Sequence, residues 1–147
     1  MQKHARILLI EDNQMDIDLT LDAFRIVRLE NEIHVCRNGQ EALDYLFGEG
    51  EYADRTTHPI PDLVLLDLKM PGIDGHEVLA KVKQCPVLRR IPVIVLTSSN
   101  EEGDRILSYD SGANSYLVKP INFEGFLELA RRVGEYWLAI NIKPPLE

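Results

Sequence analysis

Short apolar runs recur along the chain, and each is followed by a segment whose apolar residues are spaced three or four apart. The runs cover residues 7–10, 33–36, 63–66, 93–96 and 116–118. Runs that are apolar on both faces are typical of parallel strands covered on both sides by helices. Five repeats of strand and helix therefore predict a doubly wound α/β fold with a parallel sheet.

The predicted helices and two irregular stretches complete this pattern. Helical spacing covers residues 17–27, 40–47, 77–82, 105–109 and 123–138. Residues 48–61 carry glycines, charges and two prolines, so we interpret them as an extended surface loop, a tolerated insertion rather than a binding element. Residues 139–147 form a tail, because the adjacent prolines cannot continue a helix. The chain is thus predicted to be a single domain, residues 1–147, with a core of about 6–138.

Composition narrows the possible partners and location. The chain has 147 residues, a formal net charge of −8 and a pI near 5.0. This charge disfavours nucleic acid and anionic membranes, because both attract clustered Lys and Arg. It leaves open a protein partner with a basic face. The first apolar run is interrupted by Glu11 and Asp12, so it is no signal peptide, and no stretch approaches the roughly 20 apolar residues that span a bilayer. We expect a cytoplasmic protein.

The cysteines and histidines show no spacing typical of a metal or redox site. Cys36 and Cys85 are far apart, and we interpret both as buried or incidental thiols. The histidines are His4, His34, His58 and His76. None has a second ligand at helical or hairpin spacing, so no metal-binding role is predicted for them.

Polar residues stand where four of the apolar runs end. They are Glu11, Asp12 and Asn13 after the first run, Asp67 after the third, Thr97 and Ser98 after the fourth, and Lys119 and Pro120 after the fifth. In an open α/β sheet, ligands bind beyond the carboxyl ends of the strands. These side chains are therefore expected to share one crevice.

The residue types at these ends suit phosphoryl chemistry. Carboxylates that converge repel each other and need a cation, and oxygen ligands suit Mg²⁺, which also accepts a phosphate oxygen. An aspartate can act as a nucleophile and form an aspartyl phosphate. A hydroxyl and an ammonium, here from Thr97 and Lys119, would stabilise the added charge. A single acidic strand end is usually a solvated loop carboxylate, but the combination favours a functional site.

These segments resemble the response-regulator receiver family. They are Ile-Leu-Leu-Ile-Glu11-Asp12-Asn13, Leu-Leu-Asp67-Leu-Lys69-Met70-Pro71-Gly72-Ile73-Asp74-Gly75, Val-Leu-Thr97-Ser98 and Tyr116-Leu-Val-Lys119-Pro120. The resemblance spans residues 6–138. It implies a flavodoxin-like, CheY-like fold with five parallel strands in the order 2-1-3-4-5 and five helices.

The resemblance also implies a role for the acidic residues. Asp67 would be the phosphoacceptor and a ligand of Mg²⁺. Asp12 would bind the metal directly and Glu11 through water, and the backbone carbonyl of Lys69 would complete the protein ligands. Pro71 and Gly75 would shape the loop beside Asp67.

Further roles implied by the resemblance fall on the fourth and fifth strands. Thr97 would bind a phosphoryl oxygen and move together with Tyr116, the switch aromatic. Lys119 would pair with the phosphate. Its bond to Pro120 is expected to be cis, which costs only about 0.5–1 kcal/mol at an X-Pro bond.

A narrower resemblance is to the small response regulators paired with cyanobacterial phytochromes, which are light-sensing histidine kinases. It rests on Glu11-Asp12-Asn13, on the insertion at 48–61, and on Tyr136-Trp137-Leu138 with its apolar, Pro-containing tail. It implies phosphotransfer from a histidine kinase, a phytochrome, and altered binding to an unknown downstream protein. Only a short tail follows the receiver, so we expect no output domain. The chain is expected to be a signalling protein that catalyses only its own phosphotransfer and slow autodephosphorylation.

Two other classes of protein stay open at this point. An aspartate-based phosphatase would use Asp67 as nucleophile, but such enzymes usually carry a second acidic residue where Lys69 stands. A flavodoxin-like cofactor carrier would have Ser, Thr and Gly after the first strand to cradle a phosphate. Glu11, Asp12 and Asn13 would instead repel one.

A second apolar stripe on the last helix predicts an interface. Leu129 and Tyr136 are seven residues apart and lie off the main stripe. Such a stripe more often contacts a partner than solvent. Together with Tyr109, Tyr116 and Val118 it predicts a symmetric homodimer through the fourth helix, fifth strand and last helix. The alternatives are that Tyr116 is a plain surface aromatic and that the chain is a monomer whose stripe is the edge of the core.

Overall fold

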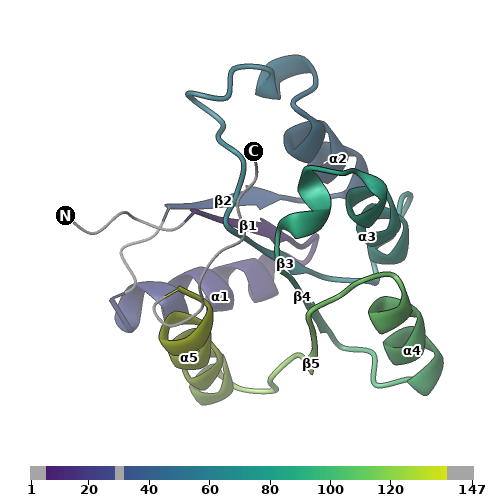
Figure 1. The fold of residues 1–147 in the computed structure, drawn as a ribbon. Helices are drawn as coiled ribbons and strands as arrows, with labels where there is room; N and C mark the ends of the chain where they lie inside the picture. Colours follow the sequence, from purple (N-terminus) through teal and green to yellow (C-terminus); the bar gives the residue numbers. More distant parts are fainter. Residues whose placement is uncertain (1–5, 29–31, 139–147) are drawn as a thin grey trace.

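Parallel strands form the centre of the molecule. A computed structural model of the chain describes residues 6–28 and 32–138, without the side chains of Glu32 and residues 136–138. The strands are β1 (Arg6–Ile10), β2 (Glu32–Cys36), β3 (Leu63–Leu66), β4 (Val93–Thr97) and β5 (Ser115–Val118). All pair in parallel, in the order β2-β1-β3-β4-β5 (Figure 1). This order, with the helices between the strands, confirms the predicted doubly wound α/β fold.

Side chains that cap the first turn mark where most of the helices begin. The helices are α1 (Gln14–Ile26), α2 (Gly39–Phe47), α3 (Gly75–Gln84), α4 (Glu102–Asp110) and α5 (Phe123–Arg132). In α1, α2, α3 and α5 the caps are Asn13, Asn38, Asp74 and Asn122, and each accepts a hydrogen bond from the backbone N–H three residues later. Each such cap contributes about 1 kcal/mol and fixes the residue at which the helix starts.

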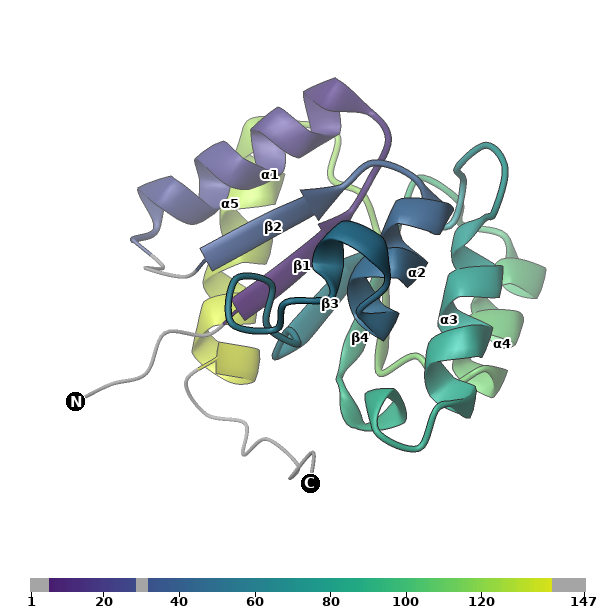
Figure 2. The same cartoon turned by 90° about the horizontal axis from the view of Figure 1, so that it is seen from above.

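Helices cover both faces of the sheet, α1 and α5 on one side and α2, α3 and α4 on the other (Figure 2). Strand residues that pack with α2 and α3 are Leu8, Ile10, Val64, Leu66, Val93 and Val95, and those that pack with α1 and α5 are Ile7, Leu9, Leu63, Leu65, Ile94 and Leu96. Successive strand residues point to opposite faces, so a sheet covered on both sides needs apolar residues at every position. Burial of each such side chain stabilises the fold by about 1.5–3 kcal/mol.

The segment 48–61 is packed more closely than an extended surface loop. It contains a 3₁₀ turn, Gly50–Tyr52, and Tyr52 is only 4% exposed. The Arg55 guanidinium donates hydrogen bonds to the carbonyl oxygens of Tyr45 at 2.7 Å and Leu46 at 2.6 Å. These carbonyls belong to the last turn of α2, where carbonyl groups lack the N–H partners of a continuing helix, and the Tyr45 carbonyl also accepts from the Gly48 N–H at 3.3 Å. The insertion therefore covers the end of α2 and is held more closely than the extended surface loop that the sequence predicts.

Four aromatic rings join the insertion to the sheet. They are His34 of β2, Tyr45 of α2, and Tyr52 and His58 of the insertion; their centroids lie 4.6–6.0 Å apart, and we call them the aromatic cluster. His34 stacks on Tyr45 at 4.6 Å, and the Tyr45 hydroxyl donates to the Pro59 carbonyl at 2.9 Å. Aromatic pairs of this kind contribute about 0.5–1.5 kcal/mol beyond their burial.

The last helix differs from its prediction in two ways. α5 ends at Arg132 and the chain continues as a π-helical segment, Val133–Leu138. Leu129 is 8% exposed and packs in the core with Phe126 and Ala130, so its assignment to an exposed stripe was wrong. The physical reason is that α5 packs against both the sheet and α1, which needs a wide apolar face. The Tyr136 side chain lies outside the described part of the structure.

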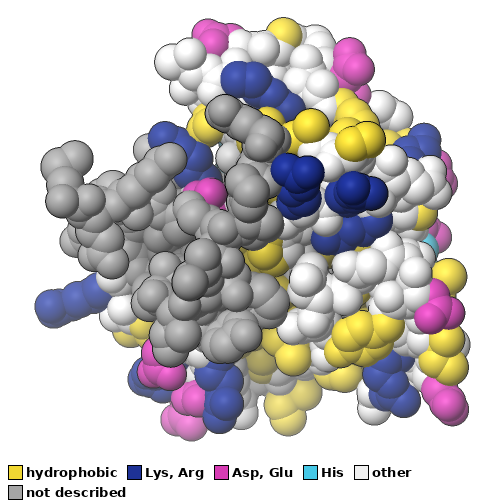
Figure 3. Space-filling view, viewed as in Figure 1, with side chains coloured by type: hydrophobic (Ala, Val, Ile, Leu, Met, Phe, Trp, Pro, Cys, Tyr) yellow, Lys and Arg dark blue, Asp and Glu magenta, His cyan; other side chains and the backbone are white. Residues whose placement is uncertain are grey.

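Other apolar side chains are exposed around α4 and β5. They are Ile106, Leu107, Tyr109, Leu117, Val118 and Ile121, which we call the α4–β5 face, and Tyr109 is 50% and Val118 46% exposed. Figure 3 shows hydrophobic side chains gathered low in the view, where Figure 1 places β5. Across residues 6–28 and 32–138, no helix combines the length and apolar character needed to cross a membrane.

Candidate functional site

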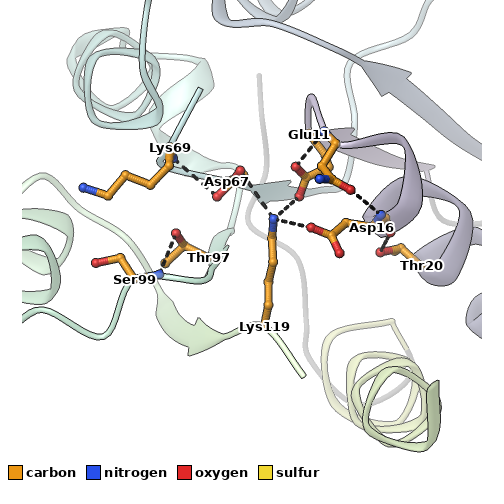
Figure 4. Close-up of polar contacts among 9 residues, drawn as sticks. Glu11, Asp16, Thr20, Asp67, Lys69, Thr97, Ser99 and Lys119 are labelled. Atoms are coloured by element: carbon orange, nitrogen blue, oxygen red, sulfur yellow. Dashed lines mark hydrogen bonds and ion pairs between the residues drawn. The ribbon is translucent and has the colours of Figure 1, made fainter. Parts of the chain in front are cut away.

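The polar residues predicted at the strand ends lie together at one edge of the sheet (Figure 4). Glu11 and Asp67 directly follow β1 and β3, Thr97 ends β4, and Lys119 follows β5. The backbone fixes these positions, because Asp67 N–H donates to the Ile10 carbonyl at 3.0 Å and Lys119 N–H to the Thr97 carbonyl at 2.8 Å. The parallel ladder thus continues past the strands and delivers four side chains to one place.

Carboxylates form the centre of the site. Glu11, Asp12 and Asp67 each offer an oxygen, and these oxygens lie within 4.8 Å of one another. Glu11 is 3% and Asp67 4% exposed, whereas Asp12 faces solvent. Burial, together with the charge of Asp67, raises the pKa of Glu11 to about 7 against the opposing effect of Lys119. A set of oxygen donors that repel each other fits a hard divalent cation such as Mg²⁺ or Mn²⁺.

One ammonium group serves three carboxylates. Lys119 Nζ lies 2.7 Å from Glu11 Oε1, 2.8 Å from Asp16 Oδ2 and 3.5 Å from Asp67 Oδ2. Burial lowers the pKa of Lys119, but the hydrogen bonds to Asp16 and Glu11 and the charge of Asp67 outweigh it and raise that pKa. Lys119 is therefore charged, as its predicted pairing with a phosphate requires. Sequence reasoning missed Asp16, which lies in the first turn of α1, three residues after the cap Asn13.

Thr97 and Tyr116 meet at the loop that follows β4. Thr97 is fully buried, and its hydroxyl oxygen accepts a hydrogen bond from Ser99 N–H at 3.3 Å. The Tyr116 hydroxyl donates to the Ser99 carbonyl at 2.8 Å. Thr97 and Tyr116, which are predicted to move together, thus both form hydrogen bonds with the backbone of Ser99.

A second polar cluster, which the sequence did not predict, lies beside this loop. Its centre is Asp104 of α4, and its other members are Lys69, His76 and Ser99; we call it the Asp104 cluster. Asp104 is bonded by the Ser99 hydroxyl at 2.6 Å, by His76 Nε2 at 3.0 Å and by Lys69 Nζ at 3.0 Å. Hydrogen bonds from Ser99, His76 and Lys69, in that order of size, hold the pKa of Asp104 below its usual range. The cluster joins the loop after Asp67 to α3 and α4.

Gly75 has the predicted place beside Asp67. A β-carbon on Gly75 would lie 2.3 Å from the Asp67 carbonyl oxygen and 2.6 Å from Leu68 Cα. Gly75 N–H also donates to the Leu68 carbonyl at 3.0 Å. The first residue of α3 must therefore be glycine for the helix to approach Asp67 this closely.

The bond between Lys119 and Pro120 is trans, as are all peptide bonds in the described residues, and not the expected cis bond. The two isomers of an X-Pro bond differ by only about 0.5–1 kcal/mol, so the residue pair alone does not determine the isomer.

Comparison with known proteins gives the class that this fold and site define. The family model of the response regulator receiver domain matches residues 7–131. The chain therefore belongs to the response regulator receiver family. The alternatives of an aspartate-based phosphatase and a cofactor carrier are set aside.

Individual relatives cover nearly the whole chain. It is 41% identical over 138 residues to the probable methanogenesis regulatory protein FilR2 of Methanothrix harundinacea, covering 94% of this chain and 86% of FilR2. It is 40% identical over 132 residues to the response regulator Rcp1 of Synechocystis sp., covering 90% of this chain and 88% of Rcp1.

Solved structures agree with this assignment. The phosphorylated cyanobacterial phytochrome response regulator RcpA is 41% identical with a TM-score of 0.90, covering 97% of this chain and 100% of RcpA. The Mn²⁺-bound form of Rcp1 is 38% identical with a TM-score of 0.86, covering 96% of this chain and 99% of Rcp1. The protein is thus a receiver-type signalling protein homologous to Rcp1 and RcpA.

Proposed function

We propose that Asp67 accepts a phosphoryl group from a histidine kinase and that the protein signals through altered protein binding. The observation that carries this proposal is the geometry around Asp67: a nearly buried carboxylate, an ammonium at 3.5 Å and two further carboxylates within 4.8 Å. One Asp67 oxygen would form the P–O bond while the P–N bond to the kinase histidine breaks. The electron pair of that bond stays on the imidazole nitrogen.

A bound divalent cation, Mg²⁺ in the cell, would neutralise charge on the carboxylates and on the incoming phosphoryl oxygens. Asp12 and Asp67 would bind it directly, Glu11 through water, and the Lys69 carbonyl would complete the protein ligands. The Mn²⁺-bound form of the homologue Rcp1 supports a divalent cation here. Asp12 is the exposed member of the set, which gives the ion a route of entry.

Two side chains of this chain would hold the added phosphate. Lys119 already lies between Glu11 and Asp67 (Figure 4). Its ammonium would replace an ion pair with a carboxylate by one with a phosphoryl oxygen. The Thr97 hydroxyl would donate to a second oxygen. Because Ser99 is bonded to both Thr97 and Tyr116, such a shift would alter the loop and the neighbouring α4–β5 face. Slow loss of the phosphate to water would reset the protein.

The likeness to RcpA supports a phytochrome as the kinase. We propose that the two proteins meet in the cytoplasm. The decisive experiment compares wild type with Asp67→Asn, using acetyl phosphate and then a phosphorylated phytochrome kinase as donors. We expect intact-mass spectrometry to show one added phosphoryl group on wild type and none on the variant, because the amide is no nucleophile. Circular dichroism should show the same fold for both. A phosphorylated Asp67→Asn protein would refute Asp67 as the phosphoacceptor. If wild type accepts phosphate from acetyl phosphate but not from the phytochrome, only the choice of kinase is refuted.

We also propose that the α4–β5 face joins two copies in a symmetric dimer. Tyr109 and Val118 remain exposed, Tyr116 is half-buried, and exposed apolar patches usually mark interfaces. A single self-complementary patch is sufficient for a two-fold contact. A double substitution, Tyr109→Glu with Val118→Glu, should give a monomer by sedimentation equilibrium at concentrations where wild type is dimeric. A monomeric wild type would assign this face to another partner.

A further inference from the structure

Three potential metal ligands converge on the α2 side of β2. His34 and Cys36 are two residues apart on the strand and therefore point to the same face. Glu41 follows in the first turn of α2. A ring nitrogen of His34, the Cys36 Sγ and a Glu41 carboxylate oxygen lie within 4.8 Å of one another. This group of three is distinct from the acidic set at Asp67.

The His34 and Cys36 side chains have unused binding capacity. His34 Nε2 is buried and has no hydrogen-bond partner among the described residues. Cys36 is a free thiol with 0% exposure. A buried polar atom without a partner is unfavourable, so a ligand for that nitrogen would stabilise the protein.

Glu41 is held in place by two hydrogen bonds. Its Oε1 accepts from the Arg37 backbone N–H at 2.8 Å, and its Oε2 accepts from the Tyr52 hydroxyl at 2.9 Å. Each carboxylate oxygen still has a free lone pair. Partners of this kind orient the carboxylates that bind metals.

The combination of donors points to zinc. Mg²⁺ prefers oxygen alone, whereas Zn²⁺ is bound by thiolate, imidazole and carboxylate together. Burial, and after it the charges of Glu41, Asp44 and Glu51, raise the pKa of the Cys36 thiol. A cation beside the sulfur would offset these carboxylate charges. With bonds of about 2.0–2.3 Å, ligand atoms on a tetrahedral zinc ion lie roughly 3–4 Å apart, so the three atoms need to close by about 1 Å.

We propose that His34, Cys36 and Glu41 bind one zinc ion, with water as the fourth ligand. A cavity of about 140 Å³ lined by His34, Tyr45 and His58 lies beside the imidazole. The thiol proton is released to solvent when the metal–sulfur bond forms. Through the Tyr52 bond to Glu41, the ion would tie the insertion to β2 and α2.

Cobalt tests this site directly, because Co²⁺ takes the ligands of Zn²⁺ and shows a sulfur-to-metal absorption band only when a thiolate binds it. The titration uses reduced, full-length protein with excess Mg²⁺ to occupy the acidic set. We expect the band to saturate at one equivalent in wild type and to disappear when Zn²⁺ is added. Cys36→Ser should lack the band, and the matched control Cys85→Ser should keep it.

Two further variants keep the thiol and so preserve its packing. Tyr52→Phe removes only the hydroxyl that orients Glu41 and should weaken Co²⁺ binding by roughly 10–100-fold. His34→Gln should weaken it at least as much, and it decides the question if Cys36→Ser does not fold. Absence of the band in wild type, its persistence in Cys36→Ser, or wild-type affinity in His34→Gln would each overturn the proposal.

Discussion

The site around Asp67 and the aromatic cluster around His34 are two polar regions built in different ways. At Asp67, carboxylates and one ammonium gather at the ends of strands. The carboxylates outnumber the ammonium, so their negative charge is in excess. At His34, four rings from β2, α2 and the insertion pack together, with one pair stacked and the others tilted or edge to face. The first region is arranged for a change of charge and the second for rigidity.

The comparison teaches how position in the chain relates to position in space. Glu11, Asp67, Thr97 and Lys119 each directly end or follow a strand, so the backbone ladder alone delivers them. The aromatic cluster depends on how α2 and the insertion are oriented on the sheet. We therefore expect substitutions at the first region to change chemistry, and substitutions at the second to change stability with phosphorylation intact.

The largest expected effect is on metal affinity within the Asp67 site. Asp12→Ala should weaken Mg²⁺ binding roughly tenfold or more, because loss of a direct ligand costs at least as much as loss of a supporting group. Glu11→Ala should cost less, since it acts through water. Isothermal titration calorimetry of both variants measures the difference.

Equal losses of affinity in Asp12→Ala and Glu11→Ala would show that the two carboxylates have the same role. Tyr45→Phe serves as the control from the aromatic cluster and should bind Mg²⁺ as wild type does.

A smaller effect is expected at the Asp104 cluster. It is charged, like the site around Asp67, and it holds separate elements together, like the aromatic cluster. Asp104→Asn should lower the free energy of unfolding by about 1–3 kcal/mol, the range for hydrogen bonds to charged groups. The lowered pKa of Asp104 means that its stabilisation is present above the ordinary aspartate value of about 4 and is lost as pH falls below it. Urea unfolding at neutral and acidic pH should therefore show the difference between variant and wild type shrinking in acid.

Glu77→Gln is the matched control, because Glu77 pairs with Lys81 at 3.7 Å on the open surface of α3 with half of each side chain exposed. Such pairs contribute about 0–1 kcal/mol. If Asp104→Asn and Glu77→Gln have the same free energy of unfolding at neutral pH, the Asp104 cluster contributes no more to stability than a surface ion pair does.

The smallest effect is expected in the aromatic cluster. Tyr45→Phe removes the hydroxyl that donates to the Pro59 carbonyl and keeps the ring stacked on His34. Loss of one such bond should cost about 0.5–1.5 kcal/mol. Thermal unfolding measures the loss, and the rate of phosphorylation by acetyl phosphate should not change. A slower rate would show that the two regions are coupled.

The sequence predicted what the backbone determines and missed what side-chain packing determines. Asp67, Thr97 and Lys119 were found because apolar runs show where strands end. The rotation of a helix about its axis is less visible, which is why Leu129 was wrongly predicted to be exposed.

Contacts between separate elements leave no local pattern. The Asp104 cluster gathers residues from α3, α4 and two loops, and nothing in their spacing indicates that they meet. For His34 and Cys36 a signal was present, since alternate residues of a strand share a face. It was overlooked because only helical and hairpin spacings were considered.

The position of Lys119 favours one order of events in the phosphotransfer that we propose. Its ammonium lies 2.7 Å from Glu11 and 2.8 Å from Asp16, and farther from Asp67, at 3.5 Å. A phosphoryl donor that arrives first would meet uncompensated carboxylates and a lysine already occupied. A bound cation would compensate the charge of Glu11, and Lys119 would then be available to Asp67, so productive encounters with the donor would follow cation binding and not precede it.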